Sequence, residues 1–192
     1  GVSRVLVELI KREWPQLWEN LFSDLNTLCQ NGETQTELVL QTLLRLSEDV
    51  VRFQNLPQAR RRELLQALTS AMPSIFSFFI YILKNNLDVH RLQDGQKSEK
   101  ACKICQSVLD TLTGFVDWVN ISHIIESDLL PLLCGLLLDK HLCLRASECL
   151  LLIVGRKSKL SERKPLMVLF SEEAMTVLLQ AAQNATEHIT ES

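Results

Sequence analysis

The chain has 192 residues, of which 46% are hydrophobic and 22% charged, enough to bury the core of one or two compact domains. Its formal charge of −3 argues against a protein whose whole surface binds nucleic acid, although local basic patches remain possible. No apolar run reaches about 18 residues, so the sequence predicts no membrane span. Leucine dominates the apolar residues while glycine and proline are scarce, which favours long helices over strands.

A helical pattern is already under way at Val2, so we expect the chain to be a piece of something longer. The first helix is predicted over about residues 2–12. Pro15 is expected to open a second helix at its first position, where the missing N–H costs nothing. Asn31-Gly32 should end that second helix.

The third expected helix, over about residues 33–53, has the clearest pattern. Apolar residues recur on one face, and polar residues recur on another. The apolar stripe is Val39, Leu43, Leu46, Val50 and Phe53, and the polar stripe is Gln41, Arg45, Glu48 and Arg52. One face of this helix should therefore join a core, and the other should meet solvent or a partner.

A turn at 55–57 precedes a long helix over about 59–86. Pro73 falls inside it and predicts either a kink or a short break. The polar stretch 88–99 contains Asp94-Gly95 and is expected to be a mobile loop.

The next helix is expected over about 99–119. Its apolar stripe is Ala101, Ile104, Val108, Leu112, Phe115 and Val119, and the opposite side carries Lys103, Ser107, Asp110, Gly114 and Asp117. Further helices are predicted over about 121–139 and 142–155. A basic stretch at 156–164 then leads to a last helix pair that ends near residue 186 and is followed by a frayed tail.

Amphipathic helices joined antiparallel by short loops suit a bundle or a solenoid. The expected inner helices begin near 33, 97 and 141, and the last offset of about 44 residues matches the HEAT period. We therefore predict an all-α fold, an α-α superhelix of antiparallel helix pairs. It would form one HEAT-repeat solenoid segment of about three to four repeats over residues 1–192.

No residue pattern indicates catalysis or a bound metal. Cys102 and Cys105 form a C-x-x-C pair, but no second ligand pair stands at the spacing that a zinc site needs. The six cysteines lie within apolar helical patterns, as expected of reduced thiols packed in a core. None of the four histidines has a catalytic partner at suitable spacing. We expect no enzyme activity and no cofactor.

Two basic clusters stand out. The first is Arg60, Arg61 and Arg62, and the second is Arg156, Lys157, Lys159, Arg163 and Lys164. Each can be a solvated segment, or it can hold phosphates or an acidic partner. Aromatic residues are not interleaved with either cluster, so the backbone of an RNA duplex is a better candidate than stacked single-stranded bases.

Several segments run in a familiar order along nearly the whole chain: Lys11 to Pro15 with Trp18, 32–39, 43–51, 53–62, 117–124 and 163–170. Together they resemble importin-β-type transport receptors, and within these the exportins that carry microRNA precursors. Pro73, the loop 88–99 and the segment 125–146 depart from the family pattern.

The resemblance implies a HEAT-repeat receptor that shuttles between nucleus and cytoplasm. Its expected partners are Ran in the GTP form, a double-stranded RNA hairpin and nuclear pore proteins, and the GTP belongs to Ran. The residues expected to face Ran or cargo from inner helices are Gln41, Arg45, Glu48, Arg52, Lys103, Asp110, Asp117, Arg145 and Glu148. The alternative is a HEAT-repeat interaction scaffold unrelated to Ran.

Overall fold

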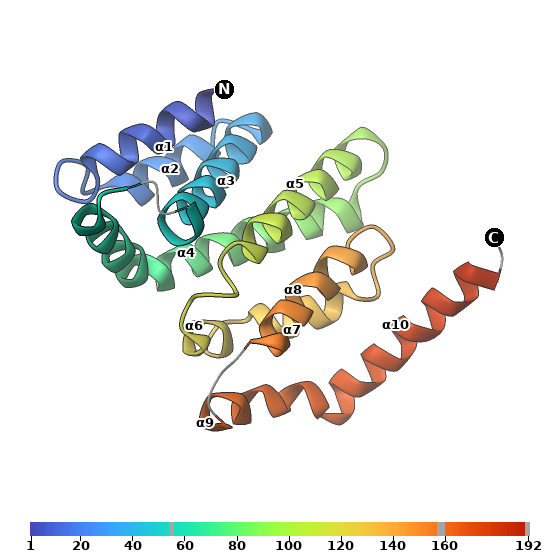
Figure 1. The fold of residues 1–192 in the computed structure, drawn as a ribbon. Helices are drawn as coiled ribbons and strands as arrows, with labels where there is room; N and C mark the ends of the chain where they lie inside the picture. The colour runs from blue at the N-terminus through green and yellow to red at the C-terminus, as the bar shows by residue number, and fades with distance from the viewer. Residues whose placement is uncertain (54–55, 157–159, 191–192) are drawn as a thin grey trace. The chain divides into compact units, whose positions relative to one another are not determined.

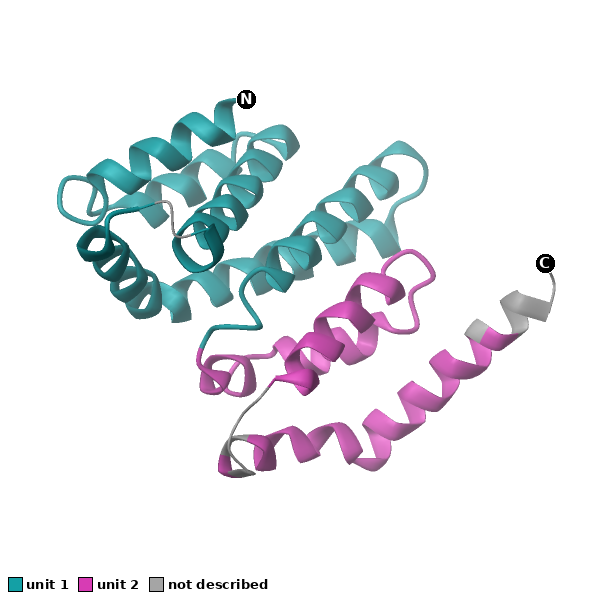
Figure 2. Ribbon diagram, viewed as in Figure 1, with its two compact units in different colours: residues 1–119 teal, residues 120–192 magenta. Residues whose placement is uncertain are grey.

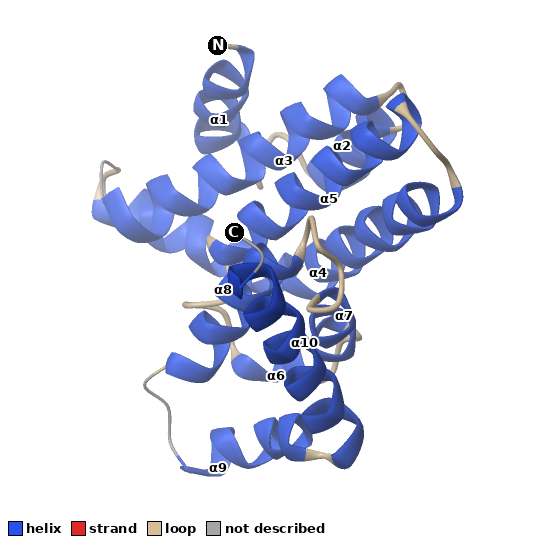
Figure 3. Ribbon diagram, turned by 90° about the vertical axis from the view of Figure 1, so that its right-hand side faces the viewer, coloured by secondary structure: helices blue, strands red, loops and turns tan. Residues whose placement is uncertain are grey.

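The structure is a computed structural model that describes residues 1–53, 56–156 and 160–190. Within these ranges every regular element is a helix and no strand occurs (Figure 1, Figure 3). The all-α prediction is therefore confirmed. The chain divides into two compact units, residues 1–119 and 120–192 (Figure 2).

Over residues 1–53 and 56–119, the first unit contains five α-helices and a π-helical turn. Their bounds are α1 Val2–Glu13, α2 Leu21–Cys29, α3 Glu33–Glu48, η1 Asp49–Phe53, α4 Gln58–Leu92 and α5 Gln96–Thr113. The second unit contains α6 Ile121–Ile125, α7 Leu129–Leu136, α8 Cys143–Gly155, α9 Leu160–Arg163, the 3-10 helix η2 Lys164–Phe170 and α10 Glu172–Thr190.

The helices of the first unit form two layers. In one layer α3 lies between α1 and α5, and in the other α2 neighbours α4. The layers join because α2 packs on α3 and α4 packs along α5. This pairing follows from amphipathic sequences, since α3 buries Val39, Leu43 and Leu46 while Gln41 and Arg45 stay exposed.

An aromatic cluster joins α4 to Phe115, two residues past the end of α5. The ring of Phe79 lies 6.3 Å from that of Phe76 and 5.4 Å from that of Phe115, in edge-to-face geometry. All three rings are almost fully buried. Edge-to-face pairs add about 0.5–1.5 kcal/mol beyond the apolar area that they bury, so this cluster fixes the α4–α5 pair firmly.

The second unit is built on the α7–α8 pair, with α6 and α10 beside α7. The element predicted over 121–139 is two helices, because Glu126 to Asp128 form a turn. Pro131 lies in the first turn of α7, where an N–H has no intrahelical partner to lose. The helix predicted over 142–155 is confirmed as α8.

The prediction that Pro15 opens the second helix is wrong. Trp14 is extended, as is common before proline, and α2 begins only at Leu21 after a turn. The Trp14–Pro15 peptide bond is cis. Leu17, which lies in this turn, is 79% exposed.

The predicted loop over 88–99 is also wrong, because α4 runs to Leu92 and α5 starts at Gln96. Most of these residues are polar but compatible with a helix, so polarity alone was a poor guide. Gly95, at φ +63°, makes the sharp turn. Across the turn the Ser98 hydroxyl donates to the His90 carbonyl at 2.8 Å.

The third helix differs from its prediction at its end. The α-helix stops at Glu48, and η1 continues it as a π-helical turn. Val50 is buried as expected, but Phe53 is 58% exposed, so the extra residue per turn removes it from the apolar stripe. Pro73 does not break α4, which is continuous around it.

By length and composition alone α4 could cross a membrane, and so could η2 and α10 taken as one bent pair. The apolar-run criterion applied to the sequence missed this. A core helix passes the same test, and α4 buries Leu64, Leu68, Met72, Phe79 and Leu83 within the first unit.

Two glycines allow a matched test of the α3–α5 packing. A Cβ on Gly114 would lie 2.4 Å from Leu44 Cδ1, whereas one on Gly135 in α7 would meet nothing within 4 Å. Gly135→Ala should raise the free energy of unfolding by about 0.5–1 kcal/mol, because alanine is the better helix former. Gly114→Ala should give a smaller gain or a loss of up to about 1 kcal/mol, because the Leu44 side chain must move aside. Urea titration measures both, and an equal gain for both variants would contradict the close packing.

Candidate partner-binding surface

Helices α3 and α5 together present a polar surface, here called the α3–α5 polar face. Its members are Gln41, Arg45, Glu48, Arg52, Lys103, Asp110 and Asp117, the residues predicted on the two helices. All are exposed except Glu48, which is half-buried. Both signs of charge are represented, so the face suits a partner with mixed charge rather than a purely anionic one.

Ion pairs close this face at both ends. Near the helix starts, Lys100 Nζ lies 3.4 Å from Glu33 Oε2. Near the helix ends, Arg52 Nη2 lies 3.3 Å from Asp117 Oδ2. The first pair joins the N-terminal ends of α3 and α5, and the second joins the segments that follow their C-terminal ends. The two helices therefore run parallel, and their polar stripes lie on the same side of the pair. Both pairs are about half exposed, so each adds little stability.

Beneath the polar face, a buried hydrogen-bond cluster holds the two helices in register. The Ser47 hydroxyl donates to the Gly114 carbonyl at 2.8 Å. The indole N–H of Trp118 points at the same carbonyl at 2.8 Å and at Ser47 Oγ at 3.0 Å. Helical spacing predicted Gly114 on the polar side of its helix. In the structure Gly114 is buried against Leu44 and belongs to this contact instead.

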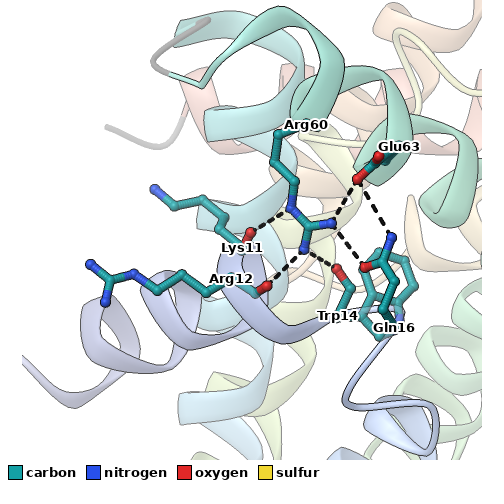
Figure 4. Close-up of polar contacts among 6 residues, drawn as sticks. All are labelled: Lys11, Arg12, Trp14, Gln16, Arg60 and Glu63. Atoms are coloured by element: carbon teal, nitrogen blue, oxygen red, sulfur yellow. Dashed lines mark hydrogen bonds and ion pairs between the residues drawn. The ribbon is translucent and has the colours of Figure 1, made fainter.

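The first predicted basic cluster is largely occupied within the fold. Arg60 donates to the carbonyls of Lys11, Arg12 and Trp14 at the end of α1, and to Gln16 and Glu63 (Figure 4). Arg61 donates to the carbonyls of Val50 at 2.6 Å and Val51 at 3.0 Å in η1. Helix ends leave carbonyls without partners, and these two arginines satisfy several. Arg62 is exposed.

The other predicted residues lie in the second unit. On α8, Glu148 is exposed and Arg145 half-buried. In the second basic cluster, Arg163 and Lys164 are exposed, and Arg163 Nη2 lies 3.3 Å from the Arg156 carbonyl. Lys157 and Lys159 lie outside the described residues.

Lys11 is a buried charge that links α1 to η1. Its ammonium group lies 2.7 Å from Asp49 Oδ2 and 2.7 Å from Glu8 Oε1, and its side chain is 8% exposed. Burial alone would lower the pKa of Lys11, but hydrogen bonds to Asp49 and Glu8 outweigh burial and raise the pKa above its ordinary 10.5. The hydrogen bond from Lys11 lowers the pKa of Glu8 below 4.5.

Each unit also has a groove. A groove of about 830 Å³ lies between α2 and α4, with Phe22, Pro73, Phe78 and Tyr81 among its walls and amide side chains such as Asn26 beside them. A second groove, of about 1090 Å³, lies among α7, α8, η2 and α10 and is lined mainly by leucines.

No metal or redox centre emerges among the described residues, where no three metal-ligating side chains cluster. Cys102 and Cys105 are buried on α5, and Cys105 Sγ lies 3.9 Å from the Leu83 carbonyl. Burial raises the pKa of the Cys29 and Cys134 thiols, which favours their protonated, unreactive form.

Comparison with known proteins places this architecture in a family. The family model described as Exportin 1-like protein matches residues 1–150. The chain belongs to this exportin family. It is 49% identical to human Exportin-5 and 46% identical to mouse Exportin-5, in each case over 96% of the chain. It is 31% identical to Exportin-5 of Dictyostelium discoideum over 83% of the chain.

The chain spans 16% of the length of the human and mouse exportins that it matches. The resemblance to exportins that was drawn from the sequence motifs is confirmed. A role in nuclear export fits this membership.

Sequence reasoning missed the structural role of Arg60 and Arg61, the buried Lys11 and the groove between α2 and α4. Arg60 sits 44 residues from Gln16 in the chain, and no local pattern could have paired them. A hint was available for the arginines, because positive charge at a helix start opposes the helix dipole and calls for a compensating acceptor.

Arg60 and Arg62 form a matched pair of neighbours for mutation. Arg60→Ala should lower the free energy of unfolding by about 2–3 kcal/mol, because it leaves several carbonyls at the end of α1 without a charged donor. Arg62→Ala should change it by less than about 0.5 kcal/mol. Guanidinium titration followed by circular dichroism tests this, and equal effects would refute the capping role.

The charge on Lys11 should stabilise the fold over a defined pH range. Because its folded pKa is raised, its contribution is complete below pH 10.5 and is lost as pH rises through the folded pKa. The Glu8 contribution is present above pH 4.5 and is lost as pH falls through its lowered pKa.

Lys11→Met should therefore destabilise the chain by about 1–3 kcal/mol at pH 7 and flatten both the acid and the alkaline limb of the stability profile. Lys103→Met, at an exposed position, is the control and should leave the profile unchanged. Urea titrations from pH 3 to pH 11 provide the comparison. Identical profiles for the Lys11 variant and the parent chain would contradict the pairing.

Proposed function

We propose that the chain is part of a nuclear export receptor that moves between nucleus and cytoplasm. In this proposal its α3–α5 polar face contacts Ran in the GTP form, and its second basic cluster contacts a double-stranded RNA cargo. The observation that carries the proposal is the 49% identity to human Exportin-5 over 96% of the chain. The α3–α5 polar face offers charges of both signs for a protein partner, and the second basic cluster offers positive charge for RNA phosphates.

The α3–α5 polar face suits a protein partner for two physical reasons. It lies on two parallel helices whose buried Ser47–Gly114–Trp118 contact holds them in place, so little ordering entropy is lost on binding. A partner carboxylate can also replace Asp117 beside Arg52. The exposed Arg52–Asp117 ion pair contributes little free energy, so little stability is lost when it is broken.

The second basic cluster suits the RNA backbone better than the first. Arg163 and Lys164 are exposed, as phosphate contacts require. Arg60 and Arg61 are half-buried and each donates to two or more carbonyls of its own chain, so of the first cluster only Arg62 stays in the proposal. Arg163 makes one such contact, of 3.3 Å with the Arg156 carbonyl, and stays exposed. An RNA duplex offers its phosphates on the outside, which matches basic residues without neighbouring aromatic rings.

Nuclear pore proteins are the third proposed partner, and the groove between α2 and α4 is where we place them. Its walls combine Phe22, Phe78 and Tyr81 with amide side chains, a mixture that accepts an apolar side chain while pairing with its backbone. The binding of Ran and RNA is expected to be coupled, and coupling is reciprocal: whatever Ran adds to RNA affinity, RNA adds to Ran affinity.

A charge swap tests the contact with Ran. The chain is titrated with Ran loaded with GTP and, separately, with GDP. Preference for the GTP form is expected, and Arg45→Glu or Arg52→Glu should weaken that binding at least about tenfold. Arg91→Glu, an exposed change on α4, is the control and should bind like the parent.

The double variant Arg52→Glu with Asp117→Arg restores the internal ion pair in reverse. It should regain the stability of the parent chain but not its affinity for Ran. If the double variant binds Ran normally, Arg52 acts only within the fold. If the parent binds both nucleotide forms equally or binds neither, the alternative of an interaction scaffold, which predicts no dependence on the nucleotide state of Ran, is favoured.

A further inference from the structure

Two serines share the same local sequence pattern, a serine followed by glutamate and then a basic residue. They are Ser98-Glu99-Lys100 and Ser161-Glu162-Arg163. A serine two residues before a base is a pattern that basophilic protein kinases select, because their substrate grooves carry acidic side chains. Both serines match this kinase pattern equally well in sequence, but their surroundings in the structure differ.

Ser98 is held within the fold. It lies in the first turn of α5, and its hydroxyl donates to the His90 carbonyl at 2.8 Å. The same oxygen lies 2.9 Å from His90 Nδ1, and the residue is half-buried. A kinase would have to break the turn between α4 and α5 to bring this hydroxyl into an active site.

Ser161 is exposed and lies in a short connection. The four-residue helix α9 that contains it leads directly into η2. Described basic residues flank it on both sides, with Arg156 before it and Arg163 and Lys164 after it. The stretch 156–164 holds five basic residues and one acidic residue, a formal charge of +4.

We propose that Ser161 is a phosphorylation site for a basophilic serine/threonine kinase. The Ser161 oxygen attacks the γ-phosphorus of magnesium-bound ATP, the bond from that phosphorus to the ADP oxygen breaks, and the serine proton passes to the catalytic aspartate of the kinase. The products are phosphoserine and ADP. Exposure, a short helical turn and positive charge on both sides favour this serine over Ser98.

Phosphorylation would change the second basic cluster directly. A phosphoserine adds a charge of about −1.5 to −2, roughly half of the cluster's charge, and lies three residues before Lys164, a spacing that allows pairing on a helical turn. If the cluster holds RNA phosphates, an inference that rests on the proposed function, the modification weakens that contact. Phosphorylation would then act as a release signal for RNA cargo.

The first experiment tests the site without RNA. The chain is incubated with magnesium-ATP and an active kinase of the protein kinase C type, and modified serines are located by tandem mass spectrometry. Ser161 should take up phosphate at least about tenfold faster than Ser98, and Arg163→Ala with Lys164→Ala should slow it at least about tenfold. Ser161→Ala should remove the major product, whereas Ser98→Ala should keep it. Preferred labelling of Ser98 or Ser158, or no labelling, would overturn the assignment.

The second experiment tests the consequence. Affinity for a fluorescent RNA duplex is measured against salt concentration for the phosphorylated and unmodified chain. Phosphorylation should weaken binding at least about fivefold at low salt and reduce the slope of log affinity against log salt by about 1–2. Unchanged RNA affinity after full modification would refute the release role. If the unmodified chain does not bind RNA, the RNA proposal fails, while the assignment of Ser161 is judged by the labelling alone.

Discussion

The close approach of α3 and α5 at Gly114 is the constraint on which the first unit depends. With no side chain there, Leu44 can fill the space, Ser47 can reach the Gly114 carbonyl, and Trp118 can cover both. The same contact aligns the two polar stripes. The seven side chains of the α3–α5 polar face therefore depend for their alignment on a contact in which none of them takes part.

Charged residues in this chain divide into those that build the fold and those that remain at the surface. Lys11, Arg60 and Arg61 bind carboxylates or carbonyls of their own chain and join α1, η1 and α4. Exposed residues such as Arg45 and Lys103 have no such task among the described contacts and are available to a partner. Neighbouring arginines can fall into different classes, as Arg61 and Arg62 do, so a basic run in the sequence is not by itself a binding patch.

Helical periodicity predicted α3 and α5 with their buried faces, because an apolar stripe at helical spacing leaves little choice of orientation, and it predicted the range of α8. It failed where local composition and tertiary contacts disagree. The 88–99 stretch is polar but helical, with a turn closed by Ser98 and His90. Phe53 leaves the apolar stripe because η1 adds a residue to its turn. The polar-face residues were found by spacing alone, whereas the roles of Arg60 and Lys11 depend on distant partners that no local pattern shows.

The central claim is that the α3–α5 polar face is where a partner binds, and hydrogen–deuterium exchange tests it most directly. Amide exchange of the chain is compared in the absence and presence of saturating Ran·GTP, with Ran·GDP as the reference. Slower exchange in α3, η1 and α5, specific to the GTP form, is the predicted result. Protection confined to the α2–α4 groove or to the second unit, with α3 and α5 unchanged, would contradict the claim.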